Sequence, residues 1–189
     1  MSEVIAKAMN STLGTEHFVG FDRLMFRKGV KASDTELWSD NLGETIVEVK
    51  DTIGEGESVY EVAYSAVIGN LSGRVNISIP DILVHRNSYS GSGLALESIA
   101  GRVHLYVNDI LYASTDTAYA SNDANREACD SRLQVSFANV KVQAGDVIKI
   151  MLEARRGVNA RVCTGYVSTD NKTISIKGTL ADYIDIERV

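Results

Sequence analysis

The sequence predicts an all-β protein built from two packed antiparallel sheets. Short segments between about residues 57 and 177 alternate apolar and polar residues, and Gly, Asn and Asp separate them. In 102–107, for example, Val103, Leu105 and Val107 would share one face. A period of two is typical of a half-buried strand, because successive side chains point to opposite sides of a sheet. A succession of such strands, with turns at this interval, indicates an antiparallel β-sandwich with little helix.

The first 43 residues differ from the remainder and predict a docking arm, helical or irregular, ahead of a sandwich at 44–189. Val4, Ile5 and Met9 would share one face of a short helix. Such a helix is marginal alone in water, so it would pack on its own domain or on a partner, and both alternatives stay open. The spacing of Ser33 and Glu36 predicts a single capped helical turn before Trp38. The apolar residues expected to make the docking contact are Val4, Ile5, Met9, Phe18, Phe21 and Leu24.

Turn residues divide residues 44–189 into strands. Pro80 lacks a backbone N–H and is expected to end the strand that it follows. Asn108 and Asp109 suit a tight hairpin turn. On the strand 58–68, residues 60, 62, 64, 66 and 68 are expected on one face. The predicted strands are 45–50, 58–68, 74–79, 82–85, 102–107, 110–112, 133–140, 147–155, 160–167 and 173–177.

Composition and charge exclude several classes of protein. Hydrophobic residues make up 44% of the 189 residues, which indicates a folded globular chain. The net charge of -6 argues against a nucleic-acid partner, because phosphate binders carry clustered basic surfaces. Residues 1–10 lack the apolar run of a secretory signal, and no stretch approaches the roughly 20 apolar residues of a membrane span. We therefore expect no membrane partner and synthesis in a cytoplasm. Cys129 and Cys163 form no disulfide framework, and whether they pair stays open.

The sequence predicts no enzyme, no cofactor and no metal site. His17, His85 and His104 stand far apart, without the spacing of zinc ligands. No nucleophile motif or phosphate loop occurs. His104 falls on the polar side of its strand and is interpreted as a solvated or core-rim histidine. A carboxylate pair of Glu61 and Glu153 would be needed for a glycosidase, but no spacing places the two across a cleft.

The polar segment 114–132 is the sharpest candidate for a contact site. Its carboxylates and amides could ligate Ca²⁺, or contact sugar hydroxyls with Tyr119 as a stacking plate. The alternative is an ordinary hydrophilic loop. The contact candidates are Asp116, Tyr119, Asp123, Asn125 and Arg126. Four tyrosines on strands would form either an aromatic platform or part of the core rim; they are Tyr60, Tyr64, Tyr106 and Tyr112.

Three stretches of the chain carry a resemblance to a known group of proteins. They are the strand and turn 103–109, the strand end and turn 137–146 with Ala-Gly-Asp at its close, and 147–150 after it. They resemble jelly-roll modules of tailed-bacteriophage virion proteins, such as tail-fibre, collar and head-decoration proteins, and of tumour-necrosis-factor-like trimers. Asp109 stands where that pattern has Gly. The resemblance covers about residues 57–178 and brings no catalytic residues with it.

The resemblance implies a jelly-roll-like β-sandwich in a non-enzymatic virion structural protein, a head-decoration, collar or tail component. Such a protein would be made in the host cytoplasm and would join other virion proteins through its arm and its sandwich faces. It implies a homo-oligomer, with a trimer favoured by analogy. Outward residues Tyr106, Met151 and Tyr166 would supply contacts between subunits. The alternative function is a carbohydrate- or receptor-binding module that recognises a host surface glycan.

Overall fold

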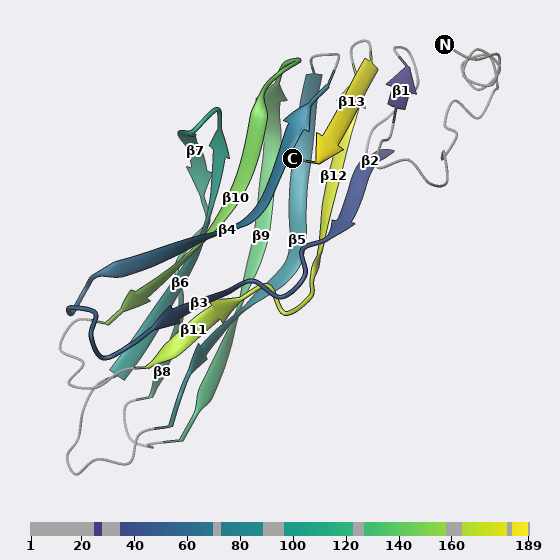
Figure 1. The fold of residues 1–189 in the computed structure, drawn as a ribbon. Helices are drawn as coiled ribbons and strands as arrows, with labels where there is room; N and C mark the ends of the chain where they lie inside the picture. Colours follow the sequence, from purple (N-terminus) through teal and green to yellow (C-terminus); the bar gives the residue numbers. More distant parts are fainter. Residues whose placement is uncertain are drawn as a thin grey trace.

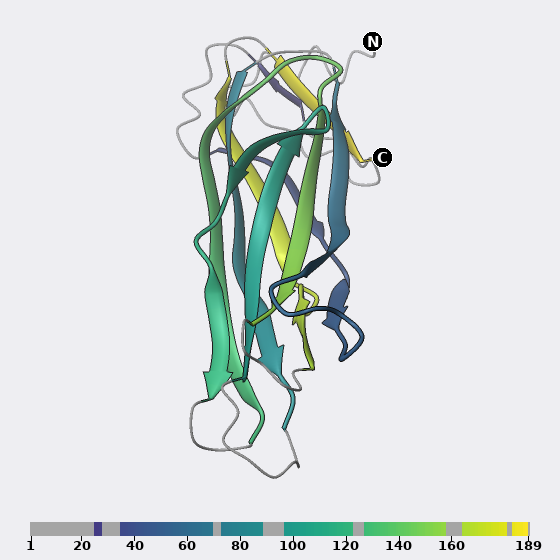
Figure 2. The same cartoon turned by 90° about the vertical axis from the view of Figure 1, so that its left-hand side faces the viewer.

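The computed structural model is an antiparallel β-sandwich that is elongated along its strands (Figures 1 and 2). It describes residues 25–27, 35–69, 73–88, 97–122, 127–157, 164–180 and 183–188. Every regular element among these residues is a strand, as the sequence predicts. None of them belongs to a helix that could cross a membrane.

One layer of the sandwich is a seven-stranded sheet with the order β1-β13-β4-β10-β6-β7, in which β8 also pairs with β6. All of its pairings are antiparallel. The strands β7 and β8 lie one after the other along β6 and together form one edge. The bounds are β1 (Met25–Arg27), β4 (Ser58–Ile68), β6 (Glu97–Val107), β7 (Ile110–Ser114), β8 (Ala118–Asn122), β10 (Val147–Arg156) and β13 (Tyr183–Arg188).

The second layer is a six-stranded sheet with the order β2-β12-β5-β11-β3, in which β9 pairs with the other side of β5. Its strands are β2 (Thr35–Asn41), β3 (Ile46–Val49), β5 (Gly73–Arg86), β9 (Cys129–Val142), β11 (Gly165–Ser168) and β12 (Thr173–Leu180). Successive strands alternate between the layers, from β4 to β5 to β6 and from β8 to β9 to β10 to β11. This alternation is the connectivity of a jelly-roll-like sandwich, in which neighbours in a sheet are distant in sequence.

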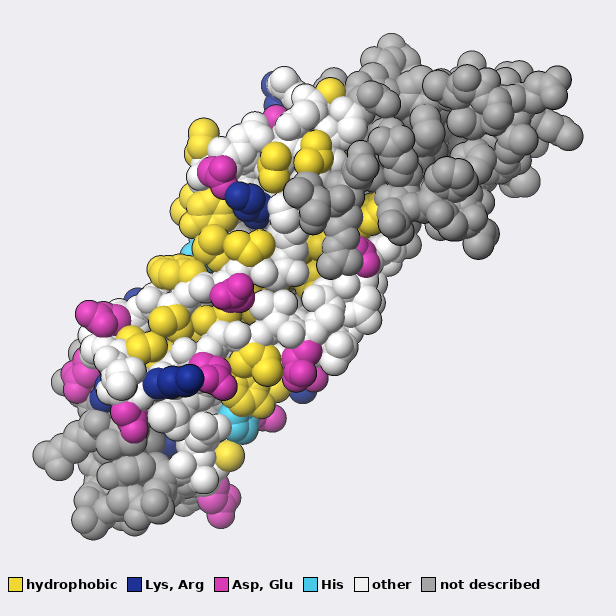
Figure 3. Space-filling model, in the orientation of Figure 1, with side chains coloured by type: hydrophobic (Ala, Val, Ile, Leu, Met, Phe, Trp, Pro, Cys, Tyr) yellow, Lys and Arg dark blue, Asp and Glu magenta, His cyan; other side chains and the backbone are white. Residues whose placement is uncertain are grey.

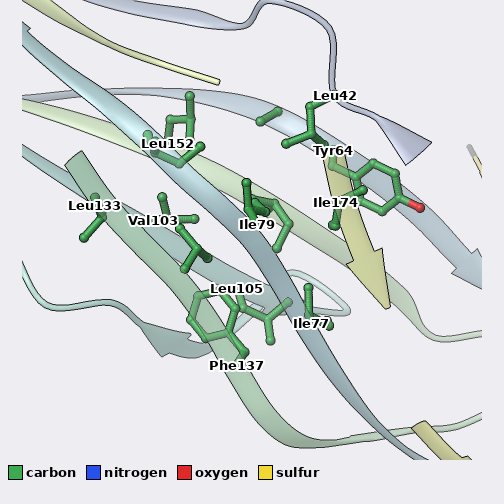
Figure 4. Packing of buried hydrophobic residues seen from close by; sticks show 14 of the residues in the cluster. Leu42, Tyr64, Ile77, Ile79, Val103, Leu105, Leu133, Phe137, Leu152 and Ile174 are labelled. Carbon is green, nitrogen blue, oxygen red and sulfur yellow. The ribbon is translucent and has the colours of Figure 1, made fainter. Parts of the chain in front are cut away.

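The core lies between the sheets and consists of the apolar sets that the alternation predicts (Figure 4). Val103 and Leu105 of β6 are fully buried, and Phe137 of β9 belongs to the same cluster. The sheets are in close contact at Gly101, where an added Cβ would lie 2.5 Å from Cγ2 of Val84. Only a glycine therefore fits at this point of β6 without a shift of the opposite sheet.

Residues 35–42 correct one prediction, because they form a strand and the start of a loop where a helical turn was expected. β2 pairs with β12, which satisfies its backbone groups, and buries Trp38 and Leu42 at 5% exposure each. Sheet pairing and burial outweigh the local capping signal here. Part of the predicted arm thus lies in the sandwich. The six apolar arm residues, from Val4 to Leu24, lie outside the described residues, and their docking role stays a prediction.

Pro80 corrects a second prediction, because β5 continues through it from Gly73 to Arg86. On one side of β5, β12 pairs only as far as Ser78 and β11 begins at Leu83. On the other side, the register with β9 shifts between Ile79 and Ile82. The proline therefore falls where no ladder requires its missing N–H.

A bulge in β4 corrects the predicted face of that strand. The register against β10 shifts so that Ile150 pairs with Tyr64 and Met151 pairs with Val62, which leaves Ala63 as an extra residue. Because a bulge reverses the alternation, Tyr64 is buried at 2% exposure, whereas Tyr60 and Val62 are 51% and 43% exposed. The strand therefore sends its tyrosines to opposite faces of the sheet.

The stretches that carry the virion resemblance meet at one end of the seven-stranded sheet. Asn108 and Asp109 form the predicted tight turn with φ of 52° and 62°, and Gly145 has a φ of 85° in the second turn. The Asn108 side chain donates to Asp146 Oδ1 at 2.8 Å and accepts the N–H of Val147 at 2.8 Å. Two turns that are distant in sequence are thus joined by side chains, which gives the shared pattern a structural reason.

The six-stranded sheet is interrupted at one level across neighbouring strands. On one side of this level β12 pairs with β2, and on the other side β11 pairs with β3. The level lies next to Pro80, where the pairing of β5 is irregular. Thr169 fills the interruption and is fully buried. Its hydroxyl accepts the N–H of Thr45 at 2.8 Å and donates to the carbonyl of Gly43 at 2.6 Å. One threonine thereby supplies the hydrogen bonds that the ladder lacks there.

Candidate binding face

The two outer surfaces of the sandwich differ in character. Seven large hydrophobic residues are exposed among the described residues, and six of them lie on strands of the seven-stranded sheet. Only Ile46 lies on the six-stranded sheet. Figure 3 shows hydrophobic side chains gathered on the face that carries β4 and β10. The six are Tyr60, Val62, Ile110, Leu111, Tyr112 and Tyr119. An uneven distribution of this kind marks a candidate contact surface.

The register of the strands arranges this outer surface, here named the candidate face, in rows that cross the sheet. Residues paired across neighbouring strands lie side by side at about 5 Å, and successive rows are about 7 Å apart. The rows are Ser58–Arg155–Ala100–Tyr119, Tyr60–Glu153–Arg102, Val62–Met151–His104–Ser114 and Ser65–Lys149–Tyr106–Leu111. Charged and hydroxyl groups occupy the centre, and aromatic and aliphatic residues surround them.

A chain of hydrogen bonds runs through the centre of the candidate face. Glu153 Oε1 accepts the hydroxyl of Ser58 at 2.6 Å, and its Oε2 accepts Nε2–H of His104 at 2.8 Å. His104 Nδ1 lies 2.7 Å from the hydroxyl of Ser114. In the neutral imidazole Nδ1 is the acceptor, so Ser114 donates to it. His104 and Glu153 are only 7% and 8% exposed. The strands β4, β6, β7 and β10 thus each contribute one residue to a polar network on the outer surface of the sheet, and its two central residues are buried.

The network keeps Glu153 ionised. Burial raises the pKa of Glu153, but hydrogen bonds from Ser58 and His104 and favourable electrostatic interactions with His104 and Arg102 outweigh it. The pKa of this carboxyl group therefore lies below its ordinary value. Arg102 is itself held in place, because its Nε donates to the hydroxyl of Thr117. The centre of the candidate face thus carries fixed charges.

Aromatic side chains border this network. The rings of Tyr60 and Tyr106 lie 6.0 Å and 6.5 Å from the ring of His104, one tilted and one edge-on. At the next row, Tyr119 and Arg155 flank Ala100, which their neighbourhood leaves 3% exposed. Tyrosine rings offer a flat apolar surface with a hydroxyl at the tip, which suits mixed polar and apolar ligands.

The contact candidates of segment 114–132 are only partly described. Tyr119 lies on β8 and on the candidate face, 54% exposed. Asp116 is exposed between β7 and β8, where its carbonyl accepts the hydroxyl of Thr115. Asp123, Asn125 and Arg126 lie outside the described residues. The segment is no single loop, since β8 and the start of β9 run through it. Sheet pairing with β6 and β5 overrides its polar composition.

The four strand tyrosines, for which a platform and a place at the core rim were the alternatives, lie in different places. Tyr60 and Tyr106 share the candidate face, whereas Tyr64 is in the core and Tyr112 donates to the carbonyl of Asn139 at 3.5 Å. The predicted subunit contacts divide in the same way. Met151 lies on the candidate face, but Tyr166 belongs to the other sheet and stacks on His85 at 4.7 Å.

Sequence reasoning missed the central network. Ser58 and Glu153 are 95 positions apart, and His104 and Glu153 are 49 apart, so no local spacing reveals them. The one available signal was that the alternation of apolar residues places His104 and Glu153 on the outward side of their strands. The carboxylate pair of Glu61 and Glu153 does not form, because Glu61 pairs with Leu152 and faces the opposite side of the sheet.

The polar groups at the centre of the candidate face are satisfied within the network. The hydrogen bonds of Glu153 and His104 end on residues of the same network. The described residues include no group of three or more His, Cys, Asp or Glu that could hold a metal ion. A network satisfied internally gives a rigid surface whose aromatic and charged groups are already in place.

Comparison with known proteins adds the fold alone. No family model matches the chain, and no curated protein matches it. Among solved structures, a chain of the T13 particle of infectious bursal disease virus aligns with 77% of this chain at 9% identity and a TM-score of 0.33. The VP2 subviral particle of that virus aligns with 78% at 11% identity and a TM-score of 0.29.

A third solved structure is the CBM36-1 domain of a multidomain xylanase from the hindgut metagenome of Trinervitermes trinervoides. It aligns with 84% of this chain at 11% identity and a TM-score of 0.26, and 98% of that domain is covered. The chain spans only 39% and 42% of the two viral chains. The structural neighbours are thus chains of viral particles and a domain of a xylanase, and similarity at this level carries no information on what this chain binds.

Proposed function

We propose that the protein is a non-enzymatic structural component of a tailed-phage virion, of the head-decoration, collar or tail class. The arm would attach the chain to other virion proteins, and the sandwich would be a rigid body that turns the candidate face outward. The observation that carries this proposal is the difference between the two outer surfaces. Among the described residues, the exposed large hydrophobic residues on the candidate face are Tyr60, Val62, Leu111 and Tyr119, whereas the six-stranded sheet exposes Ile46. A sandwich that exposes large hydrophobic side chains mainly on one outer surface is suited to contact a partner through that surface.

The packing of the sandwich supports a role as a rigid body. Its core is one continuous cluster that includes residues from both sheets. At one end of the sheet, the turns at Asn108 and Asp146 are joined by side-chain hydrogen bonds. Arg156 is 7% exposed and donates to the carbonyls of Asp51 and Ile53, which fixes the loop between β3 and β4. Oligomerisation, with a trimer as the favoured state, is part of the proposal.

Removal of residues 1–24 tests the arm. This truncation retains β1 and β2, and so retains Trp38 in the core, whereas removal of residues 1–43 would also remove Trp38 and Leu42. We expect the truncated chain to fold with the same melting temperature and to be missing from particles purified after its gene replaces the full one. Incorporation at the level of the full chain would refute the anchor role.

The non-enzymatic assignment is tested by screening generic ester and glycoside substrates. Ser114, His104 and Glu153 combine the residue types of a hydrolase triad, but the serine faces Nδ1 and the carboxylate faces Nε2. That order is the reverse of the serine-protease template, in which Nε2 faces the nucleophile. Turnover that disappears in Ser114→Ala would overturn the assignment.

The second candidate function is a carbohydrate- or receptor-binding module. The specific observation in its favour is the pair of tyrosines, Tyr60 and Tyr106, on either side of His104. A polar centre between aromatic rings is the composition of a small-molecule site, in which a few fixed polar groups orient the ligand. Loss of all glycan binding in Tyr60→Ala, with the fold retained, is the expected result of a glycan array.

A further inference from the structure

The order of groups on the candidate face favours a small polar ligand over a flat protein partner. Protein interfaces are depleted of charge at their centre and carry their polar groups on the rim. Here the arrangement is reversed, because Glu153, His104 and Arg102 form the centre. Tyr60, Val62 and Leu111 lie around it, each more than two-fifths exposed. A sugar needs such a combination, since its hydroxyls seek polar groups and its ring seeks an apolar plate.

The charge of the face indicates the class of sugar. The chain as a whole carries -6, yet Arg102, Lys149 and Arg155 stand in the rows of the candidate face beside a single carboxylate, Glu153. The carboxylate is engaged by Ser58 and His104. Lys149 contacts Asp109 at 2.5 Å at the end of the sheet.

Arg155 is the cation that remains available for a ligand. Within the described part of the chain, no residue forms an ion pair or hydrogen bond with its guanidinium. It is half-buried, and its strand pairing places it next to Ser58 and Ala100. A guanidinium is the preferred partner of a planar carboxylate, which it binds through two parallel hydrogen bonds.

The distance between Arg155 and Tyr119 fits one ligand that contacts both. Each is the cross-strand neighbour of Ala100, so their backbones are two strand spacings apart, about 10 Å. Between them stands Ala100, the smallest side chain of that row, which is only 3% exposed. A ligand with a ring beside a carboxylate can therefore stack on Tyr119 while its carboxylate reaches Arg155.

We propose that the candidate face binds a glycan that carries carboxylates, such as a chain with sialic or uronic acids. Arg155 and Arg102 hold the carboxylate, and Tyr119 and Tyr60 stack on sugar rings. The network of Glu153 and His104 keeps these groups in place. This site rests on the proposed function, in which the candidate face is turned outward, and it names the ligand class of the second candidate.

A matched pair of ligands tests the proposal. The full chain is screened on an array that pairs sialylated and uronic-acid glycans with their uncharged counterparts. The strongest acidic ligand is then titrated by calorimetry together with its methyl ester, which keeps the sugar skeleton and removes the charge. We expect binding to the acid, at least tenfold weaker binding to the ester, and weaker binding as salt is raised.

Variants locate the site. We expect at least a tenfold loss of affinity in Arg155→Gln and in Tyr119→Ala, with unchanged melting temperatures. Tyr112→Ala and Lys177→Gln, off the candidate face, are the controls and should leave affinity unchanged. The proposal is overturned by the absence of binding to every acidic glycan, by equal binding of acid and ester, or by affinity that Arg155→Gln leaves intact. Particle incorporation of the truncated chain is measured separately. A failure of glycan binding therefore leaves the test of the anchor role unaffected.

Discussion

Replacement of Glu153 by glutamine is the sharpest test of the network on the candidate face. The substitution keeps the size and shape of the side chain and removes its charge. At present two oxygens accept hydrogen bonds from Ser58 and His104 at 2.6 Å and 2.8 Å. Glutamine keeps one acceptor oxygen for Nε2–H of His104, and its amide NH₂ can donate to the hydroxyl of Ser58, which reverses that hydrogen bond. Both contacts then join neutral groups, so the charge-assisted character of both hydrogen bonds is lost.

The expected loss of stability follows from these contacts. A hydrogen bond to a charged group contributes about 1.5–3 kcal/mol and a neutral one about 0.5–1.5 kcal/mol, so each of the two hydrogen bonds is weakened by about 1–1.5 kcal/mol. Because Glu153 is 8% exposed, solvent screens the effect little. We expect Glu153→Gln to lower the free energy of unfolding at pH 7 by about 2–3 kcal/mol, or about 4–10 °C in melting temperature for a chain of this size.

The effect must depend on pH in one direction. The pKa of Glu153 is lowered in the folded state, so its charge stabilises the fold at pH values above the ordinary carboxyl value of 4.5, and that stabilisation is lost as pH falls through the folded value. Urea unfolding at pH 7 and near pH 3 should therefore give a large difference between wild type and variant at pH 7 and a small one in acid.

Glu61→Gln provides the control for charge removal, since Glu61 is exposed on the adjacent strand and should change stability by less than about 0.5 kcal/mol. An equal difference between wild type and Glu153→Gln at both pH values would show that the charge of Glu153 contributes nothing. That outcome would refute the electrostatic account of the network.

Three further substitutions test packing and turns through urea unfolding. Gly101→Ala should destabilise by about 1–3 kcal/mol because its Cβ would lie 2.5 Å from Val84 Cγ2, and adding Val84→Ala should recover part of that loss; a purely additive double variant would contradict the clash. Asp146→Ala should lower stability by about 1–2 kcal/mol through loss of the hydrogen bond from Asn108 that joins the turns and of the one from Gln143 N–H within its own turn, and no change would show those bonds to be incidental. Thr169→Val should reduce stability by about 2–4 kcal/mol because the Gly43 carbonyl loses its donor, whereas Thr169→Ser should stay near wild type.

Alternation of apolar residues predicted the strands because burial on one face imposes it directly. Val47 and Val49 of β3, and Val103 and Leu105 of β6, point into the core as expected. The turn at Asn108 was also predictable, since a turn with positive φ at both central residues accepts few residue types. These features depend on local stereochemistry and on a core that requires apolar residues on one side.

Features that depend on the partner strand could not be read from the sequence. The bulge at Ala63 exists only in relation to β10, and it alone sends Tyr60 outward and Tyr64 inward. Pro80 is tolerated because of what its neighbouring strands do at that level. The candidate face was predictable in part, through Tyr106 and Tyr119, but its central contacts join β4, β6 and β10, whose order no local pattern specifies.

The interruption at Thr169 gives the six-stranded sheet a mechanical seam. On either side of it the strands are joined by regular ladders, whereas at the seam itself a threonine hydroxyl bridges Gly43 and Thr45. Tension or shear on the six-stranded sheet would concentrate at this line, because the Thr169 hydroxyl and a few isolated backbone hydrogen bonds yield more easily than a ladder that must break as a unit. The seven-stranded sheet, which carries the candidate face, has ladders that run along β10 from Val147 to Arg156, so bending of the other sheet would leave the rows of the candidate face in register.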